Sequence, residues 1–101
     1  MTEATEQSKV LRNAGENRYE VWYGAELAGF AEYTERGEET VFTHTEIDPA
    51  FGGKGLGGRL AKFAIEDTVE REREIRPECA FIRSYLEKHP EYSAHVVSGG
   101  E

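Results

Sequence analysis

Hydrophobic and polar residues follow two different periods along the chain, and the change falls near its middle. In the first half, β-branched and aromatic residues alternate with polar ones over Arg18 to Tyr23, Leu27 to Thr34 and Glu39 to Asp48, a pattern typical of strands with one buried face. Short turns separate these runs at Gly24-Ala25 and at Arg36-Gly37-Glu38. The pattern therefore predicts an antiparallel meander of three strands.

From about Leu56 the period becomes helical. The residues that fall on one side of this helix are Leu56, Leu60, Phe63, Ala64 and Thr68. Pro77 is predicted to close the helix, and the apolar run Cys79-Ala80-Phe81-Ile82 predicts a strand parallel to the third one, because a helix lies between them. A last helix is expected from Ser84, as its N-cap, to about Lys88.

The predicted order β-β-β-α-β-α defines an α+β fold, with a mostly antiparallel sheet, one βαβ crossover and a C-terminal helix. A chain of 101 residues has the size of one small domain. We expect this domain to span residues 10–97, with flexible tails at 1–9 and 98–101.

Charge and composition narrow the range of functions. Twenty acids against twelve Lys and Arg give a net charge of −8, which repels nucleic-acid phosphates and favours cationic partners such as amines. No apolar run approaches the ~18–20 residues of a membrane span, and the N-terminus does not resemble a secretory signal. The single cysteine, Cys79, allows neither an internal disulfide nor a multi-thiolate metal site. We expect a cytoplasmic monomer without a metal, a membrane or a nucleic-acid partner.

A glycine-rich segment joins the third strand to the first helix. Residues 51–58 hold five glycines, and residues 50–65 hold no acid but include Lys54, Arg59 and Lys62. The unpaired N–H groups of a helix start attract anions, and glycines let a phosphate come close to them. A turn alone would explain one or two glycines, so the segment predicts a bound phosphate group.

Two common phosphate motifs fit this segment poorly. The P-loop form needs Lys followed by Ser or Thr after its last glycine, but Arg59 follows Gly58 here. Gly53-Lys54-Gly55-Leu56-Gly57-Gly58 satisfies the spacing of the dinucleotide fingerprint, which also expects an acid about 20 residues further on, at the end of the next strand. Arg83 ends the predicted strand instead, and the chain is too short for repeated βαβ units.

At these residues the sequence resembles the GNAT superfamily of acetyl-CoA-dependent N-acetyltransferases, whose cofactor loop has the form Q/R-x-x-G-x-G/A between a strand and a helix. Gly55 and Gly57 match the two later positions, and Gly52 stands where Gln or Arg is usual. Other segments resemble the small YjdJ-type branch: His44-Thr45-Glu46-Ile47, Pro77-Glu78-Cys79, and Tyr85 to Tyr92. The resemblance covers about residues 10–97.

The resemblance implies a trimmed GNAT fold that binds acetyl-CoA as a co-substrate. The pantetheine arm of CoA would lie between the strand that ends at Ile47 and the strand with Cys79, and the backbone would hold the pyrophosphate. The residues expected to bind the cofactor are Ile47, Gly53, Lys54, Gly55, Leu56, Gly57, Gly58 and Arg59. Larger members carry N-terminal helices over the acceptor site, so the acceptor site of this chain should be open.

Four residues are candidates for the chemistry of acetyl transfer. Strand alternation puts His44 and Glu46 on one face, opposite Thr43, Thr45 and Ile47. Either His44 or Glu46 could accept the amine proton, or they could be a structural histidine and a solvated glutamate. The resemblance implies an active-site role for Cys79, as a nucleophile or as a proton donor to the CoA thiolate, where the alternative is a packed core cysteine. Tyr85 is a further candidate acid, or a helix-packing residue.

Three functions remain open at this stage. The first is an acetyl-CoA-dependent N-acetyltransferase that acts on a primary amine, such as a small cationic amine or a lysine in a basic protein segment. The second is a non-catalytic domain that binds CoA or acyl-CoA through the same loop. The third is a small structural or interaction protein. Binding of CoA separates the third from the others, and turnover separates the first from the second.

Overall fold

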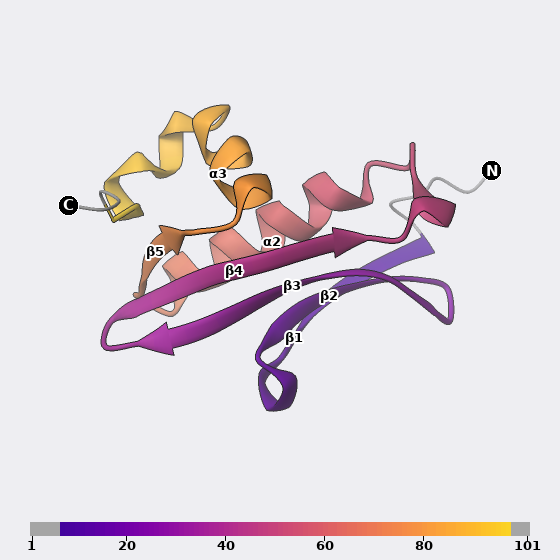
Figure 1. Ribbon diagram of the computed structural model, residues 1–101, viewed down its shortest axis with the longest axis horizontal. Helices are drawn as coiled ribbons and strands as arrows, with labels where there is room; N and C mark the ends of the chain where they lie inside the picture. Colours follow the sequence, from indigo (N-terminus) through magenta and orange to yellow (C-terminus); the bar gives the residue numbers. More distant parts are fainter. Residues whose placement is uncertain (1–6, 98–101) are drawn as a thin grey trace.

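The computed structural model describes residues 7–97, which form a five-stranded sheet with helices on one face (Figure 1). The strands lie in the order β1-β2-β3-β4-β5; β1 to β4 are antiparallel, and β5 runs parallel to β4. Their bounds are β1 (Ser8–Asn13), β2 (Arg18–Tyr23), β3 (Glu26–Arg36), β4 (Glu39–Ile47) and β5 (Glu74–Pro77). The α+β class and the single βαβ crossover are therefore confirmed.

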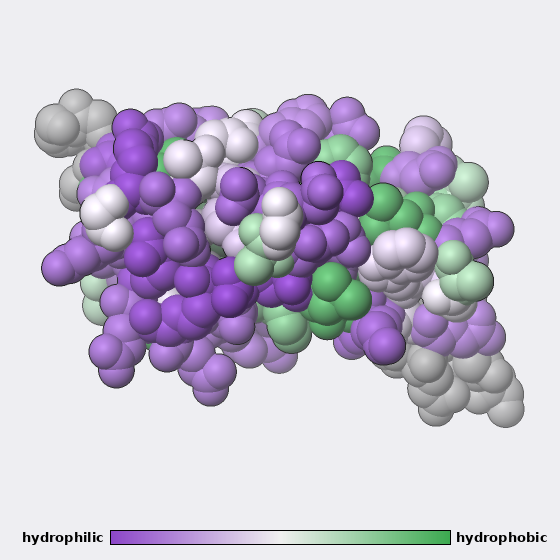
Figure 2. All heavy atoms as spheres, turned by 90° about the horizontal axis from the view of Figure 1, so that it is seen from below, coloured by the Kyte–Doolittle hydropathy of each residue, from purple (hydrophilic) through white to green (hydrophobic). Residues whose placement is uncertain are grey.

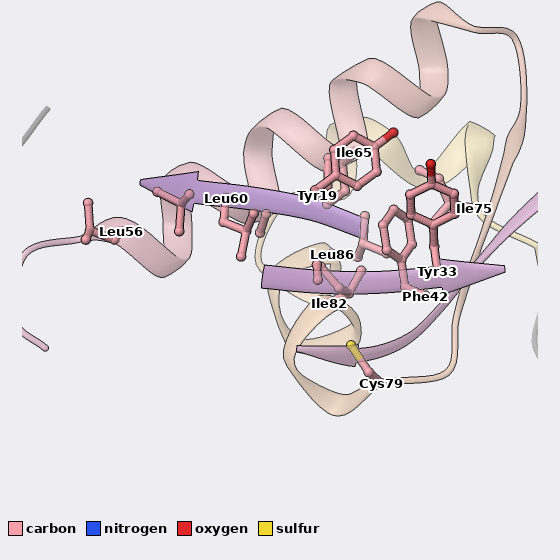
Figure 3. Packing of buried hydrophobic residues seen from close by; sticks show 14 of the residues in the cluster. Tyr19, Tyr33, Phe42, Leu56, Leu60, Ile65, Ile75, Cys79, Ile82 and Leu86 are labelled. Carbon is pink, nitrogen blue, oxygen red and sulfur yellow. The ribbon is translucent and has the colours of Figure 1, made fainter. Parts of the chain in front are cut away.

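The helices α2 (Leu56–Glu70) and α3 (Ala80–Glu87) cover the same face of the sheet. Short 3₁₀ turns complete the chain at η1 (Ala14–Glu16), η2 (Pro49–Phe51) and η3 (Pro90–His95). The apolar side of α2 packs against aromatic residues of the sheet, and Cys79 lies at the edge of this cluster (Figure 3). Leu60 and Ile65 of α2 and Tyr19 and Phe42 of the sheet are fully buried, and burial of such side chains is the main source of stability in a domain of this size.

Two elements differ from the sequence-based prediction. The predicted strand over residues 79–82 is wrong, because β5 comes earlier, and Cys79 is the N-cap of α3. The predicted helix start at Ser84 is wrong for the same reason. Glu72, with φ of 62°, turns the chain after α2, so the residues before Pro77 are free to form a strand. Ile82 and Leu86 then bury one face of α3, at the i, i+4 spacing of a helix.

The N-terminal strand β1 was not predicted. It pairs with β2 from Ser8↔Tyr23 to Asn13↔Arg18, so Ser8 and Lys9 belong to the sheet and not to a tail. Asn17, in the left-handed conformation with φ of 56°, helps to reverse the chain between the two strands. The rest of the predicted tails, residues 1–6 and 98–101, lies outside the described residues.

One extra residue in β4 changes which side chains face the helices. Tyr33 pairs with Phe42 and Glu32 pairs with His44, so Thr43 has no partner on β3. This is the pairing of a β-bulge. Phe42 lies in the core before the bulge, and Thr45 contacts Cys79 after it. His44 and Glu46 point to the other face, as predicted, and contact each other there.

Neither α2 nor α3 lies on that other face of the sheet. Figure 2 views the molecule from this side, and the surface is largely hydrophilic with small, separate apolar areas. Glu20 is the one buried acid among residues 7–97, and its carboxylate accepts hydrogen bonds from Asn13, Arg18 and Trp22 on this face. This face is thus formed by bare strands.

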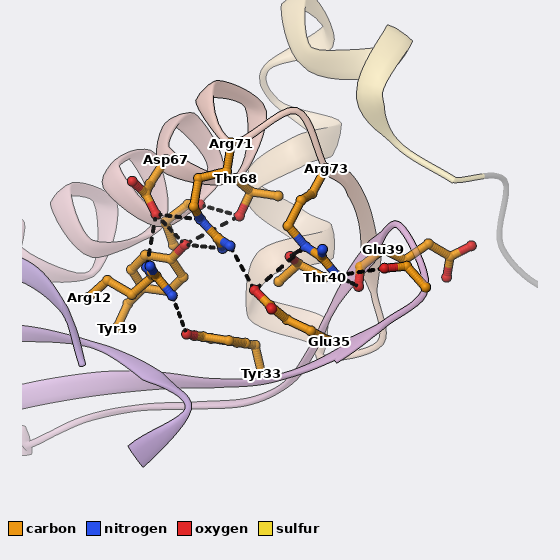
Figure 4. Close-up of polar contacts among 12 residues, drawn as sticks. Arg12, Tyr19, Tyr33, Glu35, Glu39, Thr40, Asp67, Thr68, Arg71 and Arg73 are labelled. Atoms are coloured by element: carbon orange, nitrogen blue, oxygen red, sulfur yellow. Dashed lines mark hydrogen bonds and ion pairs between the residues drawn. The ribbon is translucent and has the colours of Figure 1, made fainter. Parts of the chain in front are cut away.

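A polar network at the far end of α2 joins this helix to the sheet (Figure 4). The Arg71 guanidinium donates to Glu35 at 2.7 Å, to Asp67 at 3.1 Å and to the Tyr19 hydroxyl at 3.1 Å. Burial raises the pKa of Tyr19 to about 12, so this hydroxyl stays protonated and donates to Asp67 at 2.7 Å. Burial alone would raise the pKa of Glu35, but the hydrogen bond and charge of Arg71, with Arg73 and Arg12, lower it overall.

This network predicts a stability that depends on Glu35 and on pH. A carboxylate whose pKa is lower in the folded than in the unfolded state contributes stability above the unfolded value, near 4.5, and loses it as pH falls below that value. We expect Glu35→Gln to cost about 0.5 kcal/mol at pH 7, as for partly exposed ion pairs, and less at pH 3.5. Urea unfolding at both pH values measures this.

Glu38→Gln is the matched control, because the Glu38 side chain makes no ion pair with any of residues 7–97. Equal pH dependence in Glu35→Gln, Glu38→Gln and the unmodified protein would contradict the prediction.

Candidate functional site

The glycine segment forms an uncapped helix start at one end of the sheet. Gly55 is the N-cap of α2, with φ of 73°, and no side chain caps the helix there. The first turn of α2 contains no acid. Its N–H groups therefore keep the hydrogen-bonding capacity and the partial positive charge of a helix N-terminus, which suits a phosphate group.

Gly57 has a different role, because two side chains approach it closely. A Cβ at this position would lie 2.8 Å from Cζ of Phe81 in α3 and 3.6 Å from Cγ1 of Ile47 in β4. A Cβ at Gly58, in contrast, would have no heavy atom within 4 Å. Gly57 thus lets β4, α2 and α3 come together directly beside the helix start.

Basic and aromatic residues surround the segment. The ammonium of Lys54 lies 5.0 Å from the centre of the Tyr23 ring, and this ring contacts Phe51 at 5.7 Å. These contacts hold the segment over the end of β2. Arg59 lies one turn into α2, and its N–H donates to the carbonyl of Gly55 at 3.2 Å.

The pairing of β4 with β5 stops before the end of β4. The last pair is Phe42↔Pro77, and the N–H of Cys79 donates to the carbonyl of Phe42 at 2.9 Å. The chain then enters α3, so β4 beyond Phe42 has no strand on that side. We call this open edge of β4, with the start of α3 beside it, the splay. The resemblance implied such an opening between β4 and a strand with Cys79, but its second wall is the start of α3 and not a strand.

The backbone of Ile47 faces this splay. The N–H of Asp48 donates to the carbonyl of Ala28 in β3 at 2.8 Å. Successive N–H groups of a strand point to opposite edges, so the N–H of Ile47 points away from β3. It has no backbone partner among residues 7–97. Such a group can donate to an oxygen that enters the splay.

Cys79 lies in the wall of the splay, in contact with β4. Its Sγ is 3.2 Å from Oγ1 of Thr45, and the side chain is largely buried. Thr45 is a residue that the sequence analysis did not single out as functional. Nothing in the spacing indicates the pair, because it forms only when the bulge turns Thr45 toward α3. The hydroxyl of Thr45 can orient the thiol of Cys79 and exchange a proton with it.

The other predicted catalytic residues lie apart from this pair. Nε2 of His44 and Oε2 of Glu46 are 3.0 Å apart on the uncovered face, and both side chains are more than half exposed. Tyr85 stacks on His89 with ring centres 4.1 Å apart, and burial with the charges of Glu66 and Glu91 raises its pKa. The structure thus brings Cys79 and Ile47 to the splay, and puts His44 with Glu46 on the opposite side of β4.

A groove lies at the end of β4, beside the start of β3. It has a volume of about 590 Å³ and is lined by residues 27–30 of β3 and 46–49 at the end of β4. Glu46 and Asp48 are its charged residues, and Leu27, Phe30 and Pro49 give it an apolar wall. A cation with an apolar stem fits this lining.

The described residues contain neither a metal-binding cluster nor a membrane-spanning helix. Residues 7–97 contain no group of three or more His, Cys, Asp or Glu side chains arranged to hold a metal ion. They also contain no helix that is both long and apolar enough to cross a membrane.

Residues 18–96 match the model of the GCN5-related N-acetyltransferase family, and the chain belongs to this family. The GNAT resemblance is therefore confirmed at the level of the superfamily.

Solved structures show the same fold. The chain superposes on a GCN5-like protein from Staphylococcus aureus with a TM-score of 0.69 and 21% identity, over 100% of this chain and 95% of that one. It also resembles the ribosomal-protein-S18-alanine N-acetyltransferase from Escherichia coli, with a TM-score of 0.60 and 21% identity, over 73% of this chain and 52% of that one.

Among curated proteins, Protein NATD1 is similar over part of its length. The protein from Xenopus tropicalis is 36% identical over 55 residues, which are 54% of this chain and 50% of that protein. The human protein is 34% identical over 47 residues, 46% of this chain and 42% of its own length. The matched region thus spans about half of these relatives.

Proposed function

We propose that the protein is a cytoplasmic, acetyl-CoA-dependent N-acetyltransferase of the small YjdJ-type branch, and that it acetylates a primary amine. The observation that carries this proposal is the junction of three features: the uncapped start of α2, the splay beyond Phe42, and the thiol of Cys79 in the wall of that splay. A domain that only binds CoA needs the first two features but not the thiol.

The residues divide into those that hold CoA and those that act on the acetyl group. In the proposed complex, the N–H groups of residues 53–58 donate to the pyrophosphate, and Lys54 and Arg59 add positive charge. The pantetheine arm lies along the free edge of β4. The N–H of Ile47 donates to the carbonyl oxygen of the thioester, where negative charge develops when an amine attacks.

The proposed reaction moves one acetyl group and two protons. The neutral amine nitrogen attacks the thioester carbon, a C–N bond forms, and the C–S bond breaks. Glu46 or His44 accepts the proton that the amine nitrogen loses, directly or through water. Cys79 or Tyr85 donates a proton to the thiolate of CoA. A nucleophilic Cys79 would instead carry the acetyl group itself before the amine takes it.

The acidic groove favours a cationic acceptor. Glu46 and Asp48 lie beside the apolar wall of Phe30 and Leu27, and the whole chain carries a net charge of −8. A lysine side chain and a small cationic amine share this chemistry: an ammonium on an apolar stem. Both are proposed acceptors.

Calorimetric titration with CoA, acetyl-CoA, NAD and ATP tests the proposal. We expect CoA and acetyl-CoA to bind at least ten times more tightly than NAD or ATP, because the glycine segment fits neither of the motifs that hold those nucleotides.

Mass spectrometry of a lysine peptide and a diamine, incubated with acetyl-CoA and the protein, then tests turnover. Tighter binding of NAD than of CoA would overturn the proposal that CoA is the ligand of this protein. Binding of CoA without acetylation of any amine would favour a non-catalytic domain.

A further inference from the structure

The beginnings of β1 and α2 lie at the same end of the molecule as the glycine segment (Figure 1). A second group of basic residues lies between these two elements. It lines a cleft of about 390 Å³, which we call the β1–α2 cleft. One wall is formed by Ser8, Lys9 and Val10, and the other by Arg59, Lys62, Phe63 and Glu66. Three cations and one acid thus surround a cleft in a protein with a strong excess of acids.

The three cations of the cleft have no acidic partners. Among residues 7–97, Arg12, Arg18, Arg36, Arg71, Arg73 and Arg76 all form ion pairs. The other six, namely Lys9, Lys54, Arg59, Lys62, Arg83 and Lys88, form none with any described residue, although carboxylates outnumber basic groups in the chain. Three of these six, Lys9, Arg59 and Lys62, lie together in the cleft. Unpaired like charges repel one another, so their concentration here indicates a place for an anion.

Arg59 supplies an independent indication. Its Nε is buried and has no hydrogen-bond partner, the one such side-chain atom found among residues 7–97. Buried polar groups normally have a partner, and each exception calls for an explanation. A guanidinium that binds an oxyanion with two parallel N–H groups would give this Nε its acceptor.

The one acid of the cleft is engaged elsewhere. Oε2 of Glu66 accepts a hydrogen bond from the Tyr92 hydroxyl at 2.7 Å, and this bond raises the pKa of Tyr92 to about 12. Glu66 comes seven residues after Arg59, about two helical turns toward the other end of α2. The positive charge therefore lies at the end of the cleft next to the glycine segment.

We propose that the β1–α2 cleft binds a phosphate monoester, namely the 3′-phosphate of CoA when the pyrophosphate lies on the start of α2. This inference rests on the proposed function. The glycine segment accounts for two of the three phosphates of CoA, and a monoester carries between −1.5 and −2 charges at neutral pH. A planar guanidinium and two ammonium groups are the side chains that recognise such a group.

Paired affinities for CoA and 3′-dephospho-CoA test the assignment. They are measured at low ionic strength, because salt screens exposed charges. We expect the unmodified protein to prefer CoA by roughly tenfold, about 1.4 kcal/mol. Lys62→Ala should lose most of this preference and bind 3′-dephospho-CoA as before. Lys62 is exposed, so its removal leaves the core intact.

Lys88→Ala is the matched control, since Lys88 is an exposed lysine at the end of α3 without an ion pair among the described residues. It should keep the full preference. Equal affinity of the unmodified protein for both ligands, or an undiminished preference in Lys62→Ala, would overturn the inference. Failure to bind either ligand would instead overturn the proposed function.

Titration with inorganic phosphate, followed by amide NMR, distinguishes the source of the phosphate group. In the free protein we expect shifts at residues 8–10 and 59–63, and in the CoA-saturated protein we expect these shifts to be absent because the cleft is filled. Shifts confined to residues 53–58 would show that the cleft binds no anion. Phosphate binding to the cleft of the CoA-saturated protein would assign it to a free phosphate and not to CoA.

Discussion

Gly55→Asp is expected to weaken CoA binding by at least about 100-fold while the domain stays folded. The new carboxylate would stand at the start of α2, where the proposed pyrophosphate lies, and like charges in this position repel. A Cβ at Gly55 would have no heavy atom within 4 Å, so the side chain fits without a clash. The positive φ of 73° costs a side chain roughly 1–2 kcal/mol, and the preference for Asp at an N-cap offsets about 1 kcal/mol of that.

Gly37→Asp provides the matched control. Gly37 also has a positive φ, of 53°, and open space around its Cβ, but it lies in the β3–β4 turn at the other end of the molecule. Circular dichroism and thermal unfolding should be similar for the two variants, and calorimetry should show CoA binding in Gly37→Asp alone. A folded Gly55→Asp that binds CoA normally would show that the glycine segment is only a turn.

Cys79→Ala is expected to lower the rate of acetyl transfer by about 100-fold, the usual contribution of a positioned acid or base. The Kd for CoA should change by less than about threefold, because the proposed contacts with CoA are mainly those of the pyrophosphate with the start of α2 and of the pantetheine arm with β4. The thiol contacts Thr45 and the edge of the core, so a modest loss of stability of about 1 kcal/mol accompanies the change. Steady-state kinetics with a diamine acceptor separate kcat from KM.

Mass spectrometry of the intact protein distinguishes the two roles of the thiol. Acetyl-CoA without an acceptor should acetylate Cys79 if the thiol is a nucleophile, and should leave it free if the thiol is an acid. Thr45→Val removes the hydroxyl 3.2 Å from Sγ and keeps a similar volume; we expect an intermediate loss of rate, recovered in Thr45→Ser. Unchanged turnover in Cys79→Ala would remove the cysteine from the mechanism and leave Tyr85 or water as the acid.

The parts of the fold that the sequence predicted are those with a strong local signal. The strand over residues 18–23 and the start of α2 follow from alternation and from a helical period after glycines. β1 was missed because its six residues, Ser-Lys-Val-Leu-Arg-Asn, include no aromatic residue and only two apolar ones. It is an edge strand, and its stability comes from pairing with β2, which is a tertiary effect.

The candidate site also has one part that the sequence predicts and another that depends on the folded structure. The glycine segment could be found from the sequence, because its proposed role as an anion site depends on neighbouring backbone groups. The contact of Thr45 with Cys79 could not, because it joins residues 34 positions apart and requires both the bulge and the early start of α3. The unpaired state of Lys9, Arg59 and Lys62 also depends on where the acids lie in space, which composition does not reveal.

The bulge at Thr43 decides how many residues the site can lose, which substitutions do not test. Thr43 is the one residue of this segment without a paired residue on β3, so its deletion would make the ladder regular. Phe42 would stay opposite Tyr33, His44 opposite Glu32 and Thr45 opposite Ala31. Because side chains alternate with a period of two, deletion of both Thr43 and His44 would instead turn Glu46 toward the helices and Thr45 and Ile47 toward solvent. The thiol would then lose its neighbour. This strand can therefore be shortened by one residue without rearranging its faces, but not by two.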